Sequence, residues 1–349
     1  GAEVYYTPEN NIEIYSRGVR PVTDTIHCGE SGLSARLFIP IAALCDAEIT
    51  ITGSGSLLQR PMKEYLKVLP QLGVSILETS DCLPLSVKGP LQPGEIAIDG
   101  SVSSQFLTGL LMAYGFTTTE TVTIHVNNLN SKPYIDLTLQ MLQYYGIPVL
   151  NHYYGAFTLS EAVFSFGTPV TIDIEGDWSA AANFVVAKAI AGDIFIHHLN
   201  YESIQADRAI MDVVNNTNSS FDFDATDFPD LFPILSVYAG YCKGVSRIKG
   251  LHRLVHKESN RIESIKAMLE NFAVTFSIEE DTLVIKGGQT FRSCTIDSFN
   301  DHRIVMAAAI AALKADGPVT ISGAEAVSKS YPGFFQALSS LGVDCQLVN

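Results

Sequence analysis

Five cations stand at or near the expected starts of helices, where a positive charge opposes the helix macrodipole. They are Arg60, Lys132, Lys257, Arg303 and Lys329. For each of them taken singly, an exposed cation on a solvated helix end is the simpler interpretation. Five at corresponding places, in a chain with only 22 lysines and arginines, indicate a shared anion site.

Hydroxyl and amide groups gather in the polar turn Gly100–Phe106, which opens onto an apolar run. Ser103, Ser104 and Gln105 stand in a row there. Free N–H groups and hydroxyls at a helix N-terminus suit a phosphate or another oxyanion. The alternative is that one serine simply caps the helix. Two serines and a glutamine exceed what a cap needs, so this turn is a candidate oxyanion site.

Two carboxylates could move protons. Asp230 opens the apolar helix expected over 231–238, and Glu258 lies beside Lys257 with Arg261 one turn on. An acid near cations keeps its charge and can act as a base, whereas a desolvated acid can donate a proton. The alternatives are an N-cap for Asp230 and a favourable first-turn charge for Glu258.

These residues stand at corresponding places because the chain repeats one structural unit. The unit consists of a helix, a strand, a second helix and closing strands. First helices are expected near Ser31, Ser103, Trp178, Asp230 and Asn300. Strands are expected at Ala47–Thr52, Thr121–Val126, Asp193–His198, Val245–Ile248 and Pro318–Ile321. Second helices are expected near Arg60, Lys132, Gln205, Lys257 and Lys329. They lie roughly 72 residues apart, except for a shorter interval after Gln205 that indicates a lost hairpin.

The first residues, 1–4 and 11–15, have the pattern of a closing hairpin, as do 72–76 and 83–87. By the repeat spacing, roughly 50 to 60 residues of a sixth copy are absent; a natural half-unit is the alternative. An apolar strand over 170–174 then ends at an acidic glycine turn. We therefore expect two domains, 1–174 and 175–349, with three units on each side once the first copy is restored.

Composition excludes several classes of protein. The net charge of −15 argues against nucleic acid or an anionic membrane as a partner. No apolar run approaches the length of a membrane span, and we expect a cytoplasmic protein. The six cysteines are scattered and the eight histidines show no metal-binding spacing, so neither a disulfide framework, a metal nor a cofactor is expected.

Six motifs together closely resemble those of the 5-enolpyruvylshikimate-3-phosphate (EPSP) synthase family, in its order and at its spacing. They are 100–106, Ser131–Tyr134, Phe228–Asp230, Lys257–Arg261, Asn300–Arg303 and Lys329–Pro332. The resemblance implies an α/β (α+β) fold of two domains, each an inside-out α/β barrel of three βαβαββ units. Here the first unit would be largely missing.

The resemblance implies transfer of the enolpyruvyl group of phosphoenolpyruvate to the 5-hydroxyl of shikimate 3-phosphate, with release of phosphate. This is a step of aromatic amino acid biosynthesis. Asp230 would take the hydroxyl proton and Glu258 would protonate the methylene carbon. Shikimate 3-phosphate would be held by Ser103, Ser104, Gln105, Ser131, Tyr134, Asp230 and Lys257. Phosphoenolpyruvate would be held by Gly32, Arg60, Gln105, Arg261, Arg303 and Lys329.

Three departures from the family pattern weaken the expected activity of this chain. The family's N-terminal Gly-Ser-Lys-Ser segment falls in the absent copy. The loop at 30–36 keeps Gly32 and Arg36 but has Leu33 where threonine is usual. Val255 replaces the usual arginine ahead of Lys257, with Arg253 as a nearby substitute.

Two alternatives stay open. The related UDP-N-acetylglucosamine enolpyruvyl transferases use a cysteine on a glycine-rich loop, and the matching stretch 53–56 contains none. The other alternative is a non-catalytic remnant of the fold, which would act as a binding or scaffold protein.

Two structural expectations follow from the resemblance. Arg60, Arg261, Arg303 and Lys329 should converge in one inter-domain cleft. The closing stretch 341–349 should lack a partner strand, which in the family comes from the chain's own N-terminus. The family is monomeric, whereas this chain would expose sheet edges and could be aggregation-prone or form a dimer.

Overall fold

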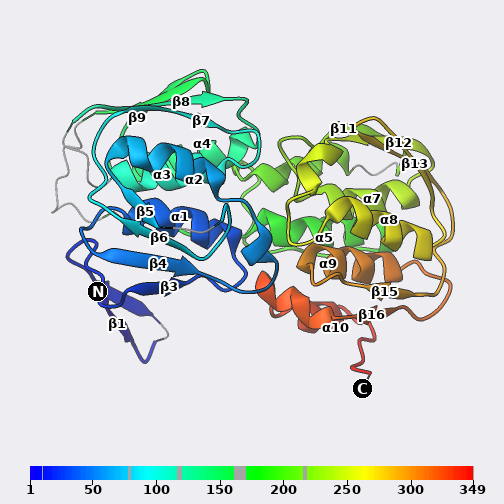
Figure 1. The fold of residues 1–349 in the computed structure, drawn as a ribbon. Helices are drawn as coiled ribbons and strands as arrows, with labels where there is room; N and C mark the ends of the chain where they lie inside the picture. Colours follow the sequence, from blue (N-terminus) through cyan, green and yellow to red (C-terminus); the bar gives the residue numbers. More distant parts are fainter. Residues whose placement is uncertain (10, 78–79, 116–119, 161–169, 215–217, 349) are drawn as a thin grey trace. The chain divides into compact units, whose positions relative to one another are not determined.

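The computed structural model describes residues 1–9, 11–77, 80–115, 120–160, 170–214 and 218–348. Its internal contacts divide the chain into two compact units, Gly1–Thr171 and Ile172–Asn349. Each unit mixes helices with β-sheets (Figure 1). The mixed α/β class expected from the sequence is therefore confirmed.

The first unit has ten described strands and four described α-helices. The strands are β1 (Glu3–Tyr6), β2 (Ile12–Tyr15), β3 (Thr25–His27), β4 (Glu48–Thr52), β5 (Ser75–Leu77), β6 (Leu85–Lys88), β7 (Glu95–Asp99), β8 (Val122–Asn127), β9 (Val149–His152) and β10 (Ala156–Leu159). The helices are α1 (Gly32–Ala42), α2 (Lys63–Val68), α3 (Gln105–Gly115) and α4 (Lys132–Tyr144).

Two sheets of this unit have the same topology, in the orders β3-β4-β6-β5 and β7-β8-β10-β9. In each, the first two strands pair in parallel and the closing hairpin adds two antiparallel strands. β1 and β2 form a separate two-stranded hairpin. This pattern is the repeat that the sequence predicts, seen twice.

The helices form because their apolar side chains share a buried face. In α3, Phe106, Leu107, Leu110 and Leu111 are all buried, whereas along β4 buried residues alternate with partly exposed ones. Ser31 caps α1 by accepting a hydrogen bond from the Ser34 amide. The buried helix faces and sheet faces make one core in this unit.

The second unit has six described strands and six described α-helices. The strands are β11 (Asp222–Asp224), β12 (Gly244–Lys249), β13 (Thr275–Glu279), β14 (Thr282–Gly287), β15 (Thr295–Asp297) and β16 (Thr320–Ser322). The helices are α5 (Trp178–Ala191), α6 (Ile210–Val213), α7 (Phe232–Tyr241), α8 (Arg261–Asn271), α9 (His302–Ala312) and α10 (Phe334–Ser340).

One sheet of this unit, β11-β12-β14-β13, repeats the topology of the first unit. The other holds only the parallel pair β15–β16. The apolar helices α5, α7 and α9 supply much of this unit's core, which is separate from that of the first unit. The first helices of three repeat copies therefore pack together in the core of the second unit.

Three expected strands are not formed. The stretches 170–174, 193–198 and 343–348 contain no strand. In three copies the strand after the first helix pairs with a closing strand, as β4 does with β6, β8 with β10 and β12 with β14. Among the described residues, no strand of the α5 copy offers such a partner to 193–198, and none pairs with 343–348. Four second helices also begin later than expected, after short 3-10 turns or irregular turns; they begin at Lys63, Ile210, Arg261 and Phe334.

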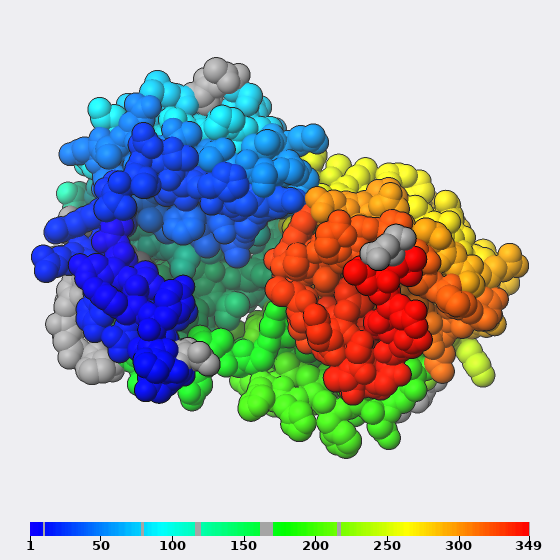
Figure 2. Space-filling view, turned by 90° about the horizontal axis from the view of Figure 1, so that it is seen from below, coloured from blue at the N-terminus to red at the C-terminus, as the bar shows by residue number. Residues whose placement is uncertain are grey.

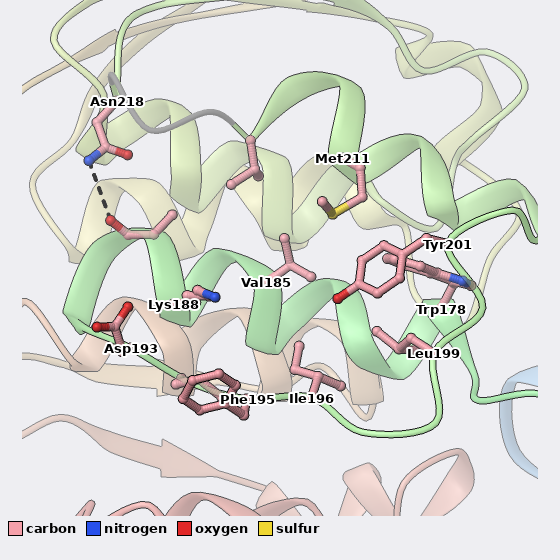
Figure 3. A pocket seen from close by; sticks show the side chains of 13 residues that line it. Trp178, Val185, Lys188, Asp193, Phe195, Ile196, Leu199, Tyr201, Met211 and Asn218 are labelled. Atoms are coloured by element: carbon pink, nitrogen blue, oxygen red, sulfur yellow. Dashed lines mark hydrogen bonds between the residues drawn. The ribbon is translucent and has the colours of Figure 1, made fainter.

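A pocket of about 370 Å³ opens beside this unpaired stretch (Figure 3). Val185 and Lys188 of α5 line one side, and Met211 of α6 lines another. Phe195 and Tyr201 come from the loop that replaces the expected strand. The pocket thus lies where the strand expected at 193–198 is not formed.

The described part of the chain contains no helix that is both long and apolar enough to cross a membrane. Its six cysteines are free thiols.

Candidate active site

Arg261 is the centre of a charge cluster in the second unit. It is the first residue of α8, and its side chain is completely buried. Its Nε lies 2.8 Å from Asp301 Oδ2, and its Nη1 lies 2.8 Å from Asp230 Oδ1. Its Nη2 lies 2.5 Å from Glu258 Oε2. Burial alone would lower the pKa of Arg261, but the three carboxylates raise it well above its usual value.

Asp230 is held by three cations. Besides Arg261, its carboxylate receives Arg303 Nη2 at 2.9 Å and lies 3.6 Å from Lys257 Nζ. Burial opposes its charge, but Arg303, Lys257 and Arg261 together hold the pKa of Asp230 well below its usual value. The carboxylate is therefore ionised throughout the neutral range and can accept hydrogen bonds.

Lys257 and Glu258 lie just before α8, in a turn that brings both to the cluster. Burial is the largest cause that lowers the pKa of Lys257, and the charges of Arg261 and Arg253 add to it, while Asp230 and Glu258 oppose it. Glu258 pairs with Arg261 and keeps about a fifth of its side chain exposed. A partly exposed carboxyl beside a buried guanidinium is placed to exchange a proton with a bound molecule.

The start of α9 closes the cluster. Asp301 is fully buried and caps the helix by accepting the Arg303 amide, while its second oxygen accepts the hydroxyl of Ser259. Lys329 donates to the carbonyl oxygen of Asn300 at 2.7 Å, so it also lies at this helix start. Burial, followed by the charges of Arg303 and Arg261, lowers the pKa of His302 to about 4. That ring is therefore neutral.

A second group of predicted residues assembles in the first unit around the start of α1. Arg60 is buried, and its Nη2 contacts Ser56 Oγ at 3.3 Å. A Cβ built on Gly32 would lie 2.8 Å from Arg60 Nη1 and 3.2 Å from Arg36 Nη1. Both guanidinium groups thus reach the same glycine. Arg36 Nη1 in turn donates to Gln105 Oε1 at 2.9 Å.

The serines of the polar turn lie near the start of α4. Ser103 Oγ accepts the Gln105 amide, so it acts as a cap of α3 as well as a candidate ligand. Ser104 and Ser131 are buried. Asn130 ties the two helix starts together, since its Nδ2 donates to the carbonyl of Ser101 at 3.1 Å.

Tyr134 follows Ser131 in the first turn of α4, and its amide donates to the Ser131 carbonyl. One turn further on, Thr108 of α3 and Thr138 of α4 share a hydroxyl contact of 3.3 Å. The N-terminal halves of the two helices therefore lie side by side. Ser131 itself adopts a left-handed conformation, with φ of 59°.

Each unit thus brings together its own share of the residues expected from sequence. Asp230, Lys257, Glu258, Arg261 and Arg303 form one cluster, with Lys329 at its edge. The site residues predicted from sequence include neither Asp301 nor Arg36, although both lie within motifs that resemble the family. Asp301 has the signature of an ordinary N-cap, and only its contact with Arg261, forty residues earlier in the sequence, reveals the second role.

The cluster in the second unit can hold anions and transfer protons. Arg261, Arg303 and Lys257 all contact Asp230, so an incoming carboxylate or phosphate would compete with Asp230 for these cations. Within the described ranges, no three His, Cys, Asp or Glu side chains are grouped to hold a metal ion.

Comparison with known families matches residues 1–338 to the sequence model of "EPSP synthase (3-phosphoshikimate 1-carboxyvinyltransferase)". A 3-phosphoshikimate 1-carboxyvinyltransferase of Clostridium novyi is 35% identical over 336 residues, which are 91% of this chain and 77% of the relative. One from Thermococcus kodakarensis is 35% identical over 338 residues, covering 92% of this chain and 82% of the relative.

Among solved structures, EPSP synthase from Acinetobacter baumannii superposes with a TM-score of 0.77 at 21% identity. The match covers 100% of this chain and 86% of that one. At this identity the likeness establishes the fold.

Proposed function

Since the chain belongs to the EPSP synthase family, we propose that it is a 3-phosphoshikimate 1-carboxyvinyltransferase. It transfers the enolpyruvyl group of phosphoenolpyruvate to the 5-hydroxyl of shikimate 3-phosphate and releases phosphate. The reaction serves the shikimate pathway and aromatic amino acid biosynthesis. The observation that carries the proposal is the cluster in which Asp230 is held by three cations and Glu258 shares Arg261 with it.

The two substrates draw on both groups of residues. Gly32, Arg60 and Gln105 of the first unit and Arg261, Arg303 and Lys329 of the second are the ligands proposed for phosphoenolpyruvate. Shikimate 3-phosphate takes Ser103, Ser104, Gln105, Ser131, Tyr134, Asp230 and Lys257. Each unit would be one enolpyruvyl transferase domain.

In the first step, the 5-oxygen of shikimate 3-phosphate attacks C2 of phosphoenolpyruvate and forms a C–O bond. Asp230 accepts the hydroxyl proton, and Glu258 gives a proton to C3, which becomes a methyl group. The product is a tetrahedral intermediate. Arg261 and Arg303 stabilise the substrate carboxylate throughout.

In the second step, the bond from C2 to the phosphate oxygen breaks and phosphate leaves with the electron pair. C3 loses a proton to Glu258, and the double bond re-forms as an enol ether. Asp230 remains a weak base by itself because its pKa is low. Its contribution is then mainly to orient the hydroxyl and accept its proton as the C–O bond forms.

Phosphate release measured with both substrates tests this function, with Glu258→Gln as the decisive variant. Glutamine keeps the shape and can still accept from Arg261, but it cannot transfer a proton. Turnover should fall by about 100-fold or more with little change in the affinity for shikimate 3-phosphate. Arg303→Ala should instead weaken phosphoenolpyruvate binding. Unchanged turnover in Glu258→Gln would refute the role, and phosphate release from neither form would favour a non-catalytic remnant.

A further inference from the structure

Arg36 is a buried cation of α1 that the proposed ligand set leaves out. Its guanidinium uses two nitrogens in different directions. Nη1 donates to Gln105 Oε1 at 2.9 Å, and Nη2 points to the carbonyl of Pro61 at 3.4 Å, directly after Arg60. Arg36 therefore connects three segments of the first unit that each carry or adjoin a proposed phosphoenolpyruvate ligand.

The contact fixes which end of the Gln105 amide is available. A guanidinium has only donors, so the group that faces it must be the amide oxygen. The NH₂ group of Gln105 is then the end turned away from Arg36. At the N-terminus of α3, where Gln105 is the first helical residue, that leaves a donor for an anion.

The position of Arg36 is held from several sides. Its guanidinium carbon lies 5.0 Å from the centre of the Phe106 ring, a cation–π contact. The Tyr65 hydroxyl contacts the carbonyls of both Arg36 and Phe106, at 2.6 and 3.1 Å. Gly109 lets the two helices approach, because a Cβ there would lie 2.3 Å from the Arg36 carbonyl. The pair Arg36–Gln105 is thus part of a rigid junction between α1 and α3.

We propose that Arg36 is a positioning residue for phosphoenolpyruvate. It holds the amide of Gln105 with its NH₂ group toward the substrate anion, and it adds a positive charge near Gly32 beside that of Arg60. The inference rests on the proposed function and extends it to a residue that contacts the substrate only through Gln105.

A double-mutant cycle tests the coupling, with KM for phosphoenolpyruvate and kcat measured by phosphate release. Arg36→Lys keeps the charge but loses the two-directional contact, and KM should rise by about tenfold while kcat falls less. Gln105→Ala should raise KM by a similar factor. The double variant should have the same KM as Gln105→Ala alone, because the side-chain amide that Arg36 orients is already absent. If the KM of the double variant rose by the product of the two single-variant factors, the proposal would be overturned.

Gln105→Glu tests the direction of the amide without altering Arg36. A carboxylate keeps the contact with Arg36 but presents an acceptor to the anion, so KM should rise at least as much as in Gln105→Ala. A tolerated Gln105→Glu would show that the oxygen faces the substrate and would overturn the proposal.

Arg247→Lys is the matched control, since Arg247 is a half-exposed arginine of β12 that should change neither constant. The melting temperature distinguishes a positioning role from a structural one. If Arg36 were merely structural, Arg36→Lys would lower the melting temperature and leave KM for phosphoenolpyruvate unchanged. Failure of the proposed function is distinguishable, as the unaltered protein would then release no phosphate; the inference would fall with it.

Discussion

At the scale of single residues, the second unit balances its charges around one buried guanidinium. Arg261 has three carboxylate partners, yet only Asp301 is completely buried with it. The other two, Asp230 and Glu258, are each about a fifth exposed and are the residues proposed for proton transfer. We infer a division of labour in which Asp301 fixes the arginine and the exposed pair remains available for substrate.

Asp301→Asn tests this division. Asparagine keeps an oxygen for the α9 cap but removes the negative charge from a fully buried ion pair. The free energy of unfolding should fall by about 3 kcal/mol, because breaking a buried pair leaves a charge poorly compensated. Urea denaturation measures it. Asp224→Asn is the matched control, because its ion pair with Lys249 is more than half exposed and should be worth less than about 1 kcal/mol. Equal losses in the two variants would contradict the argument.

His302 makes stability depend on pH. Its pKa is lowered from 6.5 to about 4 by burial and by Arg303 and Arg261, while Asp301 and Glu258 oppose the shift. Between these values the unfolded chain binds a proton at this ring and the folded chain does not. The free energy of unfolding should therefore fall as the pH is lowered from 6.5 to about 4.

The measurement compares urea denaturation at pH 7 and pH 4.5 in the unaltered protein and in His302→Gln. The loss of stability at pH 4.5 should be about 2 to 3 kcal/mol smaller in the variant. Asp230 does not obscure this window, since its depressed pKa places its loss of stabilisation at lower pH. The same loss in both proteins would show that His302 does not cause it.

At the scale of elements, the repeated unit could be predicted from the sequence. The places where an expected strand is not formed could be predicted only in part. The periodicity of α1, α3 and α4 and the alternation of β4 and β8 mark these elements in the sequence, and the structure confirms them. The stretch 193–198 has the same alternation but no strand, because a strand also needs a partner. The short repeat interval was the signal that the partner was lost.

The candidate site could likewise be predicted from the sequence only in part. Residues at helix starts could be found from motifs. A cation there is unusual because it opposes the helix dipole, and a serine there indicates a cap or an oxyanion site. Contacts between distant segments could not, because Arg36–Gln105 and Arg261–Asp301 depend on how helices pack. Neither pair has a spacing that sequence alone would reveal.

Gly109→Ala tests the junction of α1 and α3 on which the site in the first unit depends. Alanine favours a helix interior by up to about 1 kcal/mol over glycine. Here its Cβ would lie 2.3 Å from the Arg36 carbonyl and 2.4 Å from the Tyr65 hydroxyl. Forcing the helices apart costs about 1 to 3 kcal/mol or more, so the variant should be less stable overall. Thermal unfolding measures the change.

Gly155→Ala is the control, since the nearest atom to a Cβ there is the His152 carbonyl at 3.6 Å. A stabilised Gly109→Ala would mean that the helices are not in close contact.

At the scale of the whole molecule, the β1–β2 hairpin is the described element with the least cover. All eight of its residues are exposed. Val4 pairs with Ile14 and Tyr6 with Ile12, so these four side chains share one apolar face. Figure 2 shows the N-terminal residues at the surface of the first unit. A two-stranded hairpin is marginal in water unless a face is covered.

We expect this chain to associate through that face. Ile14 is 65% exposed, and a lysine there would charge the centre of the apolar face. Sedimentation velocity over a range of concentrations should show association in the unaltered chain and a shift toward monomer in Ile14→Lys. Tyr15→Lys is the matched control, because Tyr15 lies on the opposite face, where its ring packs edge-on against Tyr5 at 5.8 Å. That variant should associate like the unaltered chain. A monomer at every concentration, or equal effects of the two lysines, would show that the apolar face does not mediate contact between copies.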